Sequence, residues 1–388
     1  MNKILLITPL FKIVGRDDLF RDTEAIYDLV KYWGSDAEVY VLNTYIHGFS
    51  EIKGVLKKER LRYYRVGYDY NAENIKTTLV ERQNIIPGQI DTSIFDARRC
   101  YHIISKKLTN LNFFPTKVVV HLPSTSQSIV KKLRYNCEKI AILHMTDVKY
   151  YKKHSKKFIN FLNNYYSRVY CRSKAIHDVF KDAGLKNLKS DIIYSGVSQG
   201  NGYKLKKNIE FKNKINILYV GKLIRRKNLD ILIQTMSKFK DLNWNINVVG
   251  VGPMYDEYKK TVDILNLSKK VKFIGALPKI EVIKKMRDAD IFCMPSINET
   301  LGLVYLEAMS QGCITIGTKN EGIDGIIINN KNGFLVEPTI EDLFKLFDKI
   351  FKLSYDELEK ISYNAIQTSL EFDENNMSMK YLSIIKGE

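Results

Sequence analysis

The sequence predicts an α/β protein with two doubly wound domains, each built on a parallel sheet. Three observations support this fold class. The chain has 388 residues, which is long for a single hydrophobic core. Short apolar runs recur along it and alternate with segments of helical periodicity, which is typical of parallel strands joined by crossover helices. Residues 199–214 interrupt this alternation with Gly, Asn and Lys, the composition of a linker.

The predicted strands are the short apolar runs. In the first half of the chain they cover residues 4–7, 39–42, 118–121, 140–144, 169–171 and 192–194. In the second half they cover residues 217–220, 246–249, 271–274, 291–294, 314–316 and 334–336. Residues 61–66 are a further candidate strand, and residues 94–108 have the pattern of a helix. We therefore expect a first domain over 1–198, the linker over 199–214, a second domain over 215–372 and a last helix within 373–388.

The chain is basic, with a formal net charge of +18, and most of the excess lies in residues 1–200. Nucleic acid, an anionic membrane and anionic substrates could each explain such a charge. We find no nucleic-acid-binding motif and expect no nucleic-acid partner. Residues 150–166 mix Lys with Tyr and Phe at helical spacing, which suits a helix on anionic lipid. A Lys-rich solvated helix face explains the same pattern equally well, so both readings stay open.

Several classes of protein are disfavoured by the composition. No apolar run approaches the roughly 20 residues that a membrane span needs. The apolar start of the chain stops at Thr8-Pro9 with no small-residue cleavage site, so we interpret it as a buried strand, not a signal peptide. The cysteines are scattered without metal or redox spacing, which favours a reducing, cytoplasmic location. They are Cys100, Cys137, Cys171, Cys293 and Cys313.

The stretch that is most informative about function covers residues 291–313. An apolar strand ends at Pro295, a polar loop carries Glu299, and a helix-forming run after Gly302 carries Glu307. Helical geometry puts Glu307 only about 8 Å along the axis from Gly302. Both carboxylates can then face one crevice at the carboxyl end of a strand, where open α/β sheets bind ligands. Two acids at this spacing, taken alone, are more often solvated surface.

This stretch resembles the sugar-nucleotide site of retaining GT-B glycosyltransferases, whose pattern is roughly PS-x-x-E-x-F-G-[LIV]-x-x-x-E-A-M-x-x-G. The sequence matches the pattern throughout except at Leu301, which stands where Phe is usual and keeps the packing role. The resemblance implies that Glu299 holds the donor sugar and that Glu307 contacts the ribose hydroxyls. It also implies that backbone N–H groups of Leu301, Gly302 and Leu303 bind the diphosphate at the start of the helix.

A basic loop, GKLIRRKN over residues 221–228, resembles the family pattern G-R-L-x-x-x-K-G. Lys222 replaces Arg, which keeps the charge and loses the bidentate fork, and Asn228 replaces Gly. A diphosphate needs cations and unpaired backbone donors, which such a loop before a helix supplies. The resemblance assigns three residues of the loop to the donor diphosphate: Gly221, Lys222 and Lys227. Arg225 and Arg226 are expected to be exposed.

Two further segments of the second half fit the same resemblance. Gly250 and Gly252 lie in a turn like the family's G-x-G-P, which lines the nucleotide pocket. Residues 318–338 match the family less closely, and we expect only packing and turn roles there. Asp288 and Asp290 form a D-x-D pattern, but GT-B enzymes generally need no metal at such a place. We therefore expect no metal and no other cofactor.

The first half matches the family only in outline. Family members carry a Gly-rich loop after the first strand, and residues 10–18 hold a single Gly15. Gly15 and Arg16 are candidates for approaching the donor. His144 ends a predicted strand, where many family members place a His near the donor sugar, although a single His is more often structural. His121, also at a strand end, is the competing candidate.

Together these resemblances predict a retaining glycosyltransferase of GT-B fold, in which two Rossmann-like domains face a cleft and the last helix crosses back to the first domain. The catalytic candidates are Glu299, Lys227, Lys222 and His144. The expected donor is a nucleotide-diphosphate sugar, with a UDP-sugar favoured. The expected acceptor is a glycan or lipid-linked glycan, as in capsule or lipopolysaccharide synthesis. The enzyme would be cytoplasmic, either free or peripheral on the inner face of the membrane.

Two other functions stay open at this point. A nucleotide-sugar epimerase on the same fold would form product from the donor alone, without an acceptor. A non-catalytic sugar-nucleotide-binding subunit of a transferase complex is the second alternative. The complete set of Lys222, Lys227, Glu299 and Glu307 argues against the latter.

Overall fold

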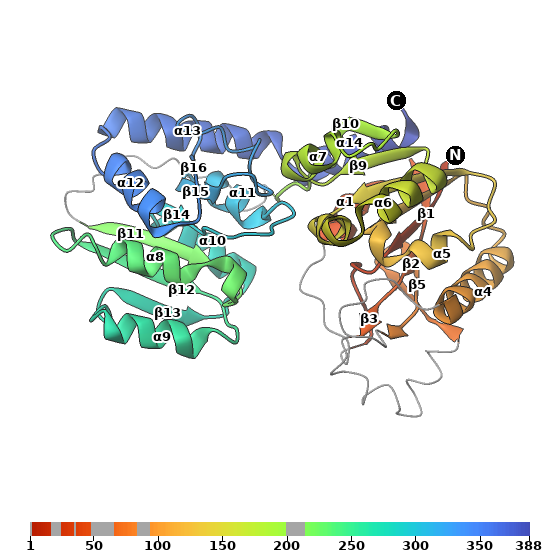
Figure 1. Ribbon diagram of the computed structural model, residues 1–388, viewed down its shortest axis with the longest axis horizontal. Coiled ribbons are helices and arrows are strands. Elements are labelled where there is room, and N and C mark those ends of the chain that lie inside the picture. Colours follow the sequence, from red (N-terminus) through yellow and green to blue (C-terminus); the bar gives the residue numbers. More distant parts are fainter. Residues whose placement is uncertain (1, 17–24, 35, 48–65, 84–93, 199–213) are drawn as a thin grey trace. The chain divides into compact units, whose positions relative to one another are not determined.

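The computed structural model describes residues 2–16, 25–34, 36–47, 66–83, 94–198 and 214–388. The chain divides into two compact units (Figure 1). The first domain comprises residues 1–172, 176–195 and 377–388, and the second comprises residues 173–175 and 196–376. Of the predicted linker only residue 214 is described, and the candidate strand at 61–66 lies outside the described residues except for Val66.

The first domain is built on an eight-stranded sheet with the order β10-β9-β8-β7-β1-β2-β5-β4. Its neighbouring strands are parallel, except that β4 runs antiparallel to β5. The strands are β1 (Asn2–Thr8), β2 (Ala37–Asn43), β4 (Tyr68–Ala72), β5 (Ile75–Leu79), β7 (Lys117–His121), β8 (Glu138–Leu143), β9 (Arg168–Cys171) and β10 (Leu188–Ile192). A separate parallel pair joins β3 (Ile46–His47) to β6 (Arg82–Gln83).

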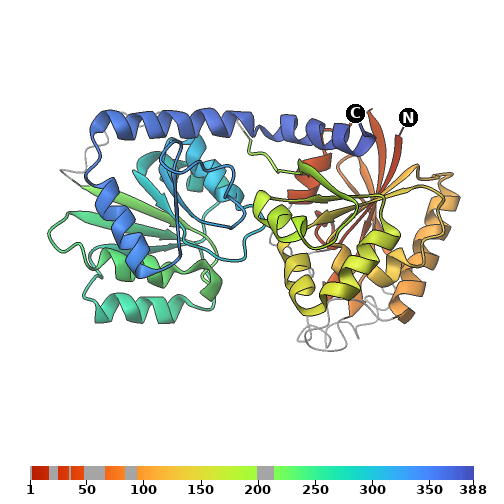
Figure 2. The same ribbon diagram turned by 45° about the horizontal axis from the view of Figure 1, so that its top comes forward.

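Helices cover both faces of this sheet (Figure 2). They are α1 (Ala25–Val30), α4 (Ile94–Asn110), η2 (Pro123–Thr125), α5 (Gln127–Val130), α6 (Met145–Tyr165), α7 (Lys174–Lys181) and α14 (Glu374–Lys386). Successive side chains of a strand point to opposite faces, so β1 contributes to two separate cores. Leu5 and Ile7 pack with α4, α5, α6 and α7, whereas Ile4 and Leu6 pack with α1 and α14. The uninterrupted apolar run at the start of the chain is therefore explained by a strand that is buried on both faces.

The second domain is built on a six-stranded, all-parallel sheet with the order β13-β12-β11-β14-β15-β16. Its strands are β11 (Ile215–Val220), β12 (Trp244–Val249), β13 (Val271–Gly275), β14 (Ile291–Cys293), β15 (Ile314–Thr318) and β16 (Phe334–Val336). Its helices are η3 (Arg225–Lys227), α8 (Leu229–Met236), α9 (Tyr255–Ile264), α10 (Lys279–Asp288), α11 (Leu303–Ser310), α12 (Ile340–Ile350) and α13 (Tyr355–Glu371). Helix α13 begins at a capping box, because Ser354 and Glu357 satisfy each other's backbone N–H groups.

The last helix, α14, packs into the first domain although the whole second domain lies between them in sequence. Trp33 Nε1 donates to the carbonyl oxygen of Ser378 at 3.0 Å, and Ser378 Oγ donates to the carbonyl oxygen of Leu29 at 2.8 Å. The rings of Trp33 and Tyr381 lie 5.2 Å apart, and Leu382 is buried against the sheet. Residues 377–388 thus complete the core that α1 begins.

The structure confirms the predicted fold class, two parallel-sheet α/β domains with covering helices, and corrects one strand. We predicted a strand at 192–194, whereas β10 covers Leu188–Ile192. This strand lies at the edge of the sheet and its middle residues are exposed, so its sequence is polar and gives no apolar signal. The hairpin of β4 and β5 was also missed, because its short strands carry alternating polar residues.

A test of the α14 packing compares two positions on that helix. Replacing Leu382 with Ala should lower the free energy of unfolding of the first domain by about 2–5 kcal/mol, because a buried side chain is lost and a cavity is left. Replacing Lys380, which is exposed on the same helix, should change it by less than about 0.5 kcal/mol. Urea denaturation of the full chain measures both values. Equal effects of the two substitutions would contradict the described packing.

Candidate functional site

The candidate site lies where the strand order of the second sheet reverses. Strands β11 and β14 are neighbours, and from them the order runs to β12 on one side and to β15 on the other. Open α/β sheets bind ligands outside the carboxyl ends of the strands at such a switch point. The loops that leave the sheet here are residues 221–228 after β11 and residues 294–302 after β14. Both loops carry residues that the sequence singled out.

Backbone and side-chain hydrogen bonds hold these two loops together. The N–H of Ile297 donates to the carbonyl oxygen of Arg226 at 2.8 Å. Asn228 Nδ2 donates to the carbonyl oxygen of Pro295, also at 2.8 Å. Asn228 has a φ of 51°, in the left-handed region that Asn adopts more readily than most residues, which explains how it substitutes for Gly. The relative position of the two loops is therefore fixed by the protein itself.

The centre of the site is an ion pair between Lys227 and Glu299. Lys227 Nζ lies 2.8 Å from Glu299 Oε1, and each side chain is only 12% exposed. Burial lowers the pKa of Lys227, and the neighbouring carboxylate of Glu299 acts against this shift. Arg226 Nη1 contacts the same oxygen of Glu299. The structure thus brings together a predicted phosphate cation and the predicted sugar-binding acid.

Two residues of this cluster were missed by the sequence analysis. Arg226 was expected to be exposed, but its side chain is 39% exposed and pairs with Glu299, whereas Arg225 is 82% exposed. Glu321, for which only packing or turn roles were expected, accepts the N–H of Glu299 through Oε2 at 2.8 Å. Burial raises the pKa of Glu321. The sequence signal for Arg226 was its place in the basic run beside Lys227. Glu321 had no comparable signal, because its segment departs from the family pattern.

The glycines of the site let two loops approach closely. A Cβ at Gly250 would lie 2.0 Å from the carbonyl oxygen of Gly221, and one at Gly252 would lie 2.3 Å from that of Leu223. The N–H of Gly221 donates to Val249, and the N–H of Leu223 donates to Val251. These glycines therefore shape the loop after β11 directly. Their predicted contact with a nucleotide stays a prediction, and so does the role of Lys222, which is exposed on the same loop.

Helix α11 begins at this site, as the sequence predicted. Gly302 is its N-cap with a φ of 82°, and a Cβ there would lie 2.7 Å from the ring of Tyr305. Tyr305 Oη donates to the carbonyl oxygen of Met294 at 2.6 Å and thereby ties the helix to the end of β14. Leu301 is buried in the position where the family has Phe, and Leu303 is the first helical residue.

Glu307 has a different partner from Glu299. It lies on α11 and pairs with Lys279 of α10, with Nζ and Oε1 3.3 Å apart. Its side chain is 17% exposed. Glu307 thus pairs with Lys279, whereas Glu299 pairs with Lys227 and Arg226.

Residues 203–368 match the model of the family "Glycosyl transferases group 1". The site described above lies within this match. The match covers most of the second domain, which is therefore similar to this family. An uncharacterised glycosyltransferase of Methanocaldococcus jannaschii is 29% identical over 60% of this chain and 64% of its own length. The chain therefore spans less than two thirds of the length of this relative.

Solved structures share the fold of this chain. HepE of Anabaena, solved in complex with UDP and glucose, aligns over all of both chains with a TM-score of 0.67 and 16% identity. The lipopolysaccharide outer core galactosyltransferase WaaB aligns over 99% of both chains, also with a TM-score of 0.67 and 16% identity. The architecture is GT-B, as predicted, and at this identity the likeness concerns the fold alone.

In the first domain, Gly15 and Arg16 follow β1 at the switch point between β1 and β7. Gly15 has a φ of 74°, which favours glycine. Arg16 is buried, and its Nη2 lies 2.9 Å from Glu81 Oε1. The guanidinium also lies over the ring of Tyr68. Arg16 is thus held by a buried carboxylate, and its approach to a donor stays a prediction.

The two candidate histidines of the first domain are bonded to each other. His121 Nδ1 lies 3.0 Å from His144 Nε2, and His121 Nε2 lies 2.9 Å from Tyr381 Oη on α14. His144 precedes α6, and Asp147 accepts its backbone N–H at 2.8 Å. Both histidines are buried, and burial is the main cause that lowers their pKa values well below the usual range. The neutral pair links β7, β8 and the last helix, and a catalytic role of His144 stays a prediction.

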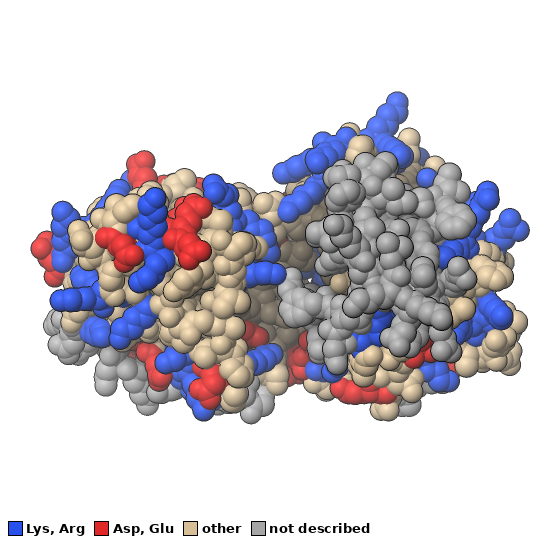
Figure 3. Space-filling model, turned by 90° about the horizontal axis from the view of Figure 1, so that it is seen from below, with Lys and Arg blue, Asp and Glu red and all other residues tan. Residues whose placement is uncertain are grey.

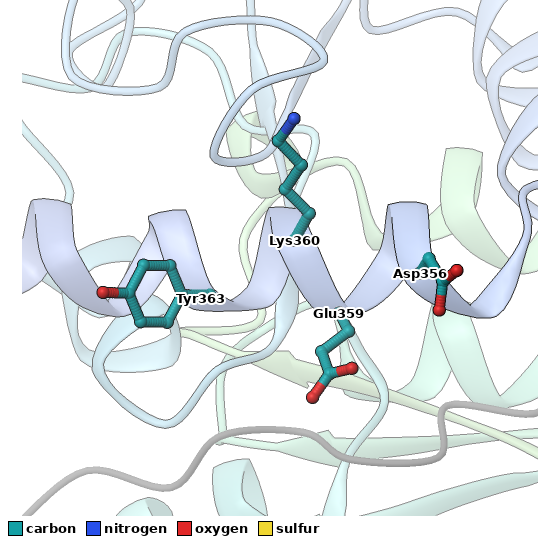
Figure 4. Close-up of a pocket in the computed structure, with 4 residues that line it drawn as sticks. All are labelled: Asp356, Glu359, Lys360 and Tyr363. Atoms are coloured by element: carbon teal, nitrogen blue, oxygen red, sulfur yellow. The ribbon is translucent and has the colours of Figure 1, made fainter.

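Other parts of the described chain offer weaker candidates. Four residues on α13, shown in Figure 4, line a shallow pocket of about 310 Å³, and all of them come from that single helix: Asp356, Glu359, Lys360 and Tyr363. This pocket contains none of the predicted donor residues. Within the described ranges, no group of three or more His, Cys, Asp or Glu side chains is arranged to hold a metal ion. Asp290 of the D-x-D pattern accepts hydrogen bonds from the backbone and side chain of Asn216.

The histidine pair predicts that acid destabilises the first domain. Because the folded state lowers both pKa values, the unfolded chain binds more protons below about pH 6.5, and the free energy of unfolding falls there. The slope reaches about 1.4 kcal/mol per pH unit for each histidine. Asp147 opposes this loss between about pH 6 and pH 4, because burial raises its pKa to about 6 and the folded state takes up that proton first.

Urea denaturation at pH 7.5, 6.5 and 5.5 isolates the effect of one histidine. His121→Gln should lose stability less steeply on acidification than the unmodified chain does. His102→Gln, at an exposed position of α4, should keep the original pH dependence. Parallel pH profiles for the His121 variant and the unmodified chain would reject the assignment.

Proposed function

We propose that this protein is a retaining glycosyltransferase that uses a nucleotide-diphosphate sugar. The observation that carries the proposal is the Lys227–Glu299 pair at the switch point of the second sheet. A cation suited to phosphate lies beside a carboxylate suited to sugar hydroxyls, within a match to a glycosyltransferase family. The glycan or lipid-linked glycan acceptor is part of the proposal.

The proposed chemistry is the transfer of a glycosyl group from phosphate to an acceptor hydroxyl. The bond between the anomeric carbon and the donor phosphate oxygen breaks, and a bond from that carbon to the acceptor oxygen forms. Negative charge develops on the departing diphosphate, where Lys222, Lys227 and the opening of α11 would stabilise it. The family resemblance gives the acceptor's proton to the donor's own phosphate oxygen, so no general base and no metal is required from the protein.

The comparisons support the choice of donor and acceptor class without deciding either. HepE, of the same fold, is solved with UDP and glucose, which supports a UDP-sugar here. WaaB is named as a lipopolysaccharide outer core galactosyltransferase, which supports an acceptor in surface-glycan synthesis. For this chain we accordingly propose a UDP-sugar and a cell-surface glycan intermediate.

Helix α6 supports a peripheral membrane location. Tyr150, Phe158 and Phe161 are buried in the core, whereas Tyr165 at the end of the helix is exposed. Most of its aromatic residues therefore do not form the lipid-binding face that the sequence pattern suggested. The exposed residues include five lysines on this one helix: Lys149, Lys152, Lys153, Lys156 and Lys157. Its acid, Asp147, is buried. We therefore propose electrostatic association with anionic headgroups, to which each Lys contributes about 1 kcal/mol near the surface.

Figure 3 shows acidic side chains interspersed among basic ones on the face that it displays. No helix among the described residues is both long and apolar enough to cross a membrane. The membrane test therefore addresses the exposed lysines of α6.

The donor proposal is tested by substitutions at the central ion pair. Glu299→Gln and Lys227→Ala should each lower transfer at least about 100-fold, because each removes a charge expected to act on the donor. Lys345→Ala, at an exposed position of α12, should leave turnover unchanged. Donors are found by thermal-shift screening with UDP-, GDP- and ADP-sugars, since a ligand that binds only the folded state raises its Tm. Near-normal turnover of either site variant would overturn the assignment, and product formed without acceptor would identify an epimerase.

The membrane proposal is tested with vesicles of phosphatidylcholine and phosphatidylglycerol. Replacing Lys152, Lys153, Lys156 and Lys157 with Gln should abolish co-sedimentation with vesicles that contain the anionic lipid. A control variant replaces four exposed lysines of the second domain and should keep binding: Lys259, Lys260, Lys284 and Lys345. The same loss in both variants would point to overall charge, and unchanged sedimentation of the α6 variant would rule the proposal out.

A further inference from the structure

We propose that Arg226 is a third cation of the donor-diphosphate site and that it gives the site its net positive charge. The inference rests on the proposed function and adds a residue that the family pattern leaves unspecified. In the pattern G-R-L-x-x-x-K-G, Arg226 occupies the variable position directly before the Lys.

The placement of Arg226 separates it from its neighbour Arg225. Both belong to η3, yet Arg225 points to solvent, 82% exposed, and lies 3.5 Å from Glu257. Arg226 is less than half as exposed and contacts Glu299 Oε1, the oxygen that also faces Lys227. Its backbone oxygen accepts the N–H of Ile297 from the loop after β14. Arg226 is thus held at the site both by its side chain and by its main chain.

A count of charges shows what Arg226 adds. The two predicted diphosphate cations, Lys222 and Lys227, are matched in number by the carboxylates of Glu299 and Glu321. Glu321 accepts the backbone N–H of Glu299. Without Arg226 these four groups have no net charge, and a diphosphate gains no net attraction from them. With Arg226 the cluster has an excess of one positive charge, to which the N-terminus of α11 adds roughly half a charge.

The shared oxygen of Glu299 suggests how the donor engages Arg226. When the hydroxyl groups of a bound sugar donate hydrogen bonds to the Glu299 carboxylate, that carboxylate no longer needs two cations at one oxygen. The guanidinium is then available to the diphosphate, which it can bind in a bidentate manner. The family pattern has its Arg at the position of Lys222, where this chain lacks a planar guanidinium for bidentate binding. Arg226 supplies such a guanidinium on the same loop, four residues further along.

Isothermal titration calorimetry of the full-length chain with UDP and with UMP tests the proposal. Arg226→Ala should weaken UDP binding by about tenfold to a hundredfold, as expected when a charge-assisted hydrogen bond is lost. Binding of UMP, which lacks the second phosphate, should weaken much less. Arg226→Lys should recover part of the UDP affinity because it keeps the charge. Arg225→Ala removes the same charge from the exposed neighbour and should bind both ligands like the unmodified chain.

The possible results separate this inference from the proposed function. If the unmodified chain binds none of UDP, GDP or ADP, the proposed function fails and the inference fails with it. If the unmodified chain binds UDP and Arg226→Ala binds it equally well, the inference is wrong and the proposed function stands. Equal losses for UDP and UMP, or an equal loss in Arg225→Ala, would show general damage to the loop or to the net charge and would also overturn the inference. The Tm of each variant verifies its folding.

Discussion

The candidate site depends on how the largely buried carboxylate of Glu299 is neutralised. Glu299 and Lys227 are both largely removed from solvent, and an unpaired charge in such a place would be strongly unfavourable. Each therefore requires the other, and the loops that carry them must keep a fixed separation. Three features fix this separation. Strands β11 and β14 are adjacent, and hydrogen bonds join residues 226–228 to residues 295–297. The backbone of Gly221 also lies in close contact with Gly250.

Much of the fold could be predicted from the sequence because strands of parallel sheets are buried on both faces. Continuous apolar runs such as residues 4–7 and 217–220 follow directly from that burial. The same reasoning failed at the edges of the first sheet. There β10 and the β4–β5 hairpin are partly exposed, so their residues are mixed in polarity and resemble loop sequence.

Lys227 and Glu299 could be predicted because they occupy fixed positions of the patterns that the sequence resembles. The contacts made by Glu299 could not be predicted, because they join loops that are distant in sequence. Arg226 and Glu321 belong to different strand–helix connections, and only the completed sheet brings both to Glu299. Side-chain direction also escapes sequence reasoning, since His144 follows a strand as expected and yet bonds to His121. The roles of His144, Gly15 and Arg16 at a donor consequently remain predictions.

The packing of α14 has a consequence for biosynthesis. A chain that emerges from the ribosome usually folds its amino-terminal domain first. Here the face of the first sheet that carries Ile4 and Leu6 stays incompletely covered until residues 377–388 have been translated. The second domain can therefore finish folding while the nascent first domain still exposes apolar surface. During that interval the growing polypeptide exposes apolar surface of the kind that chaperones bind.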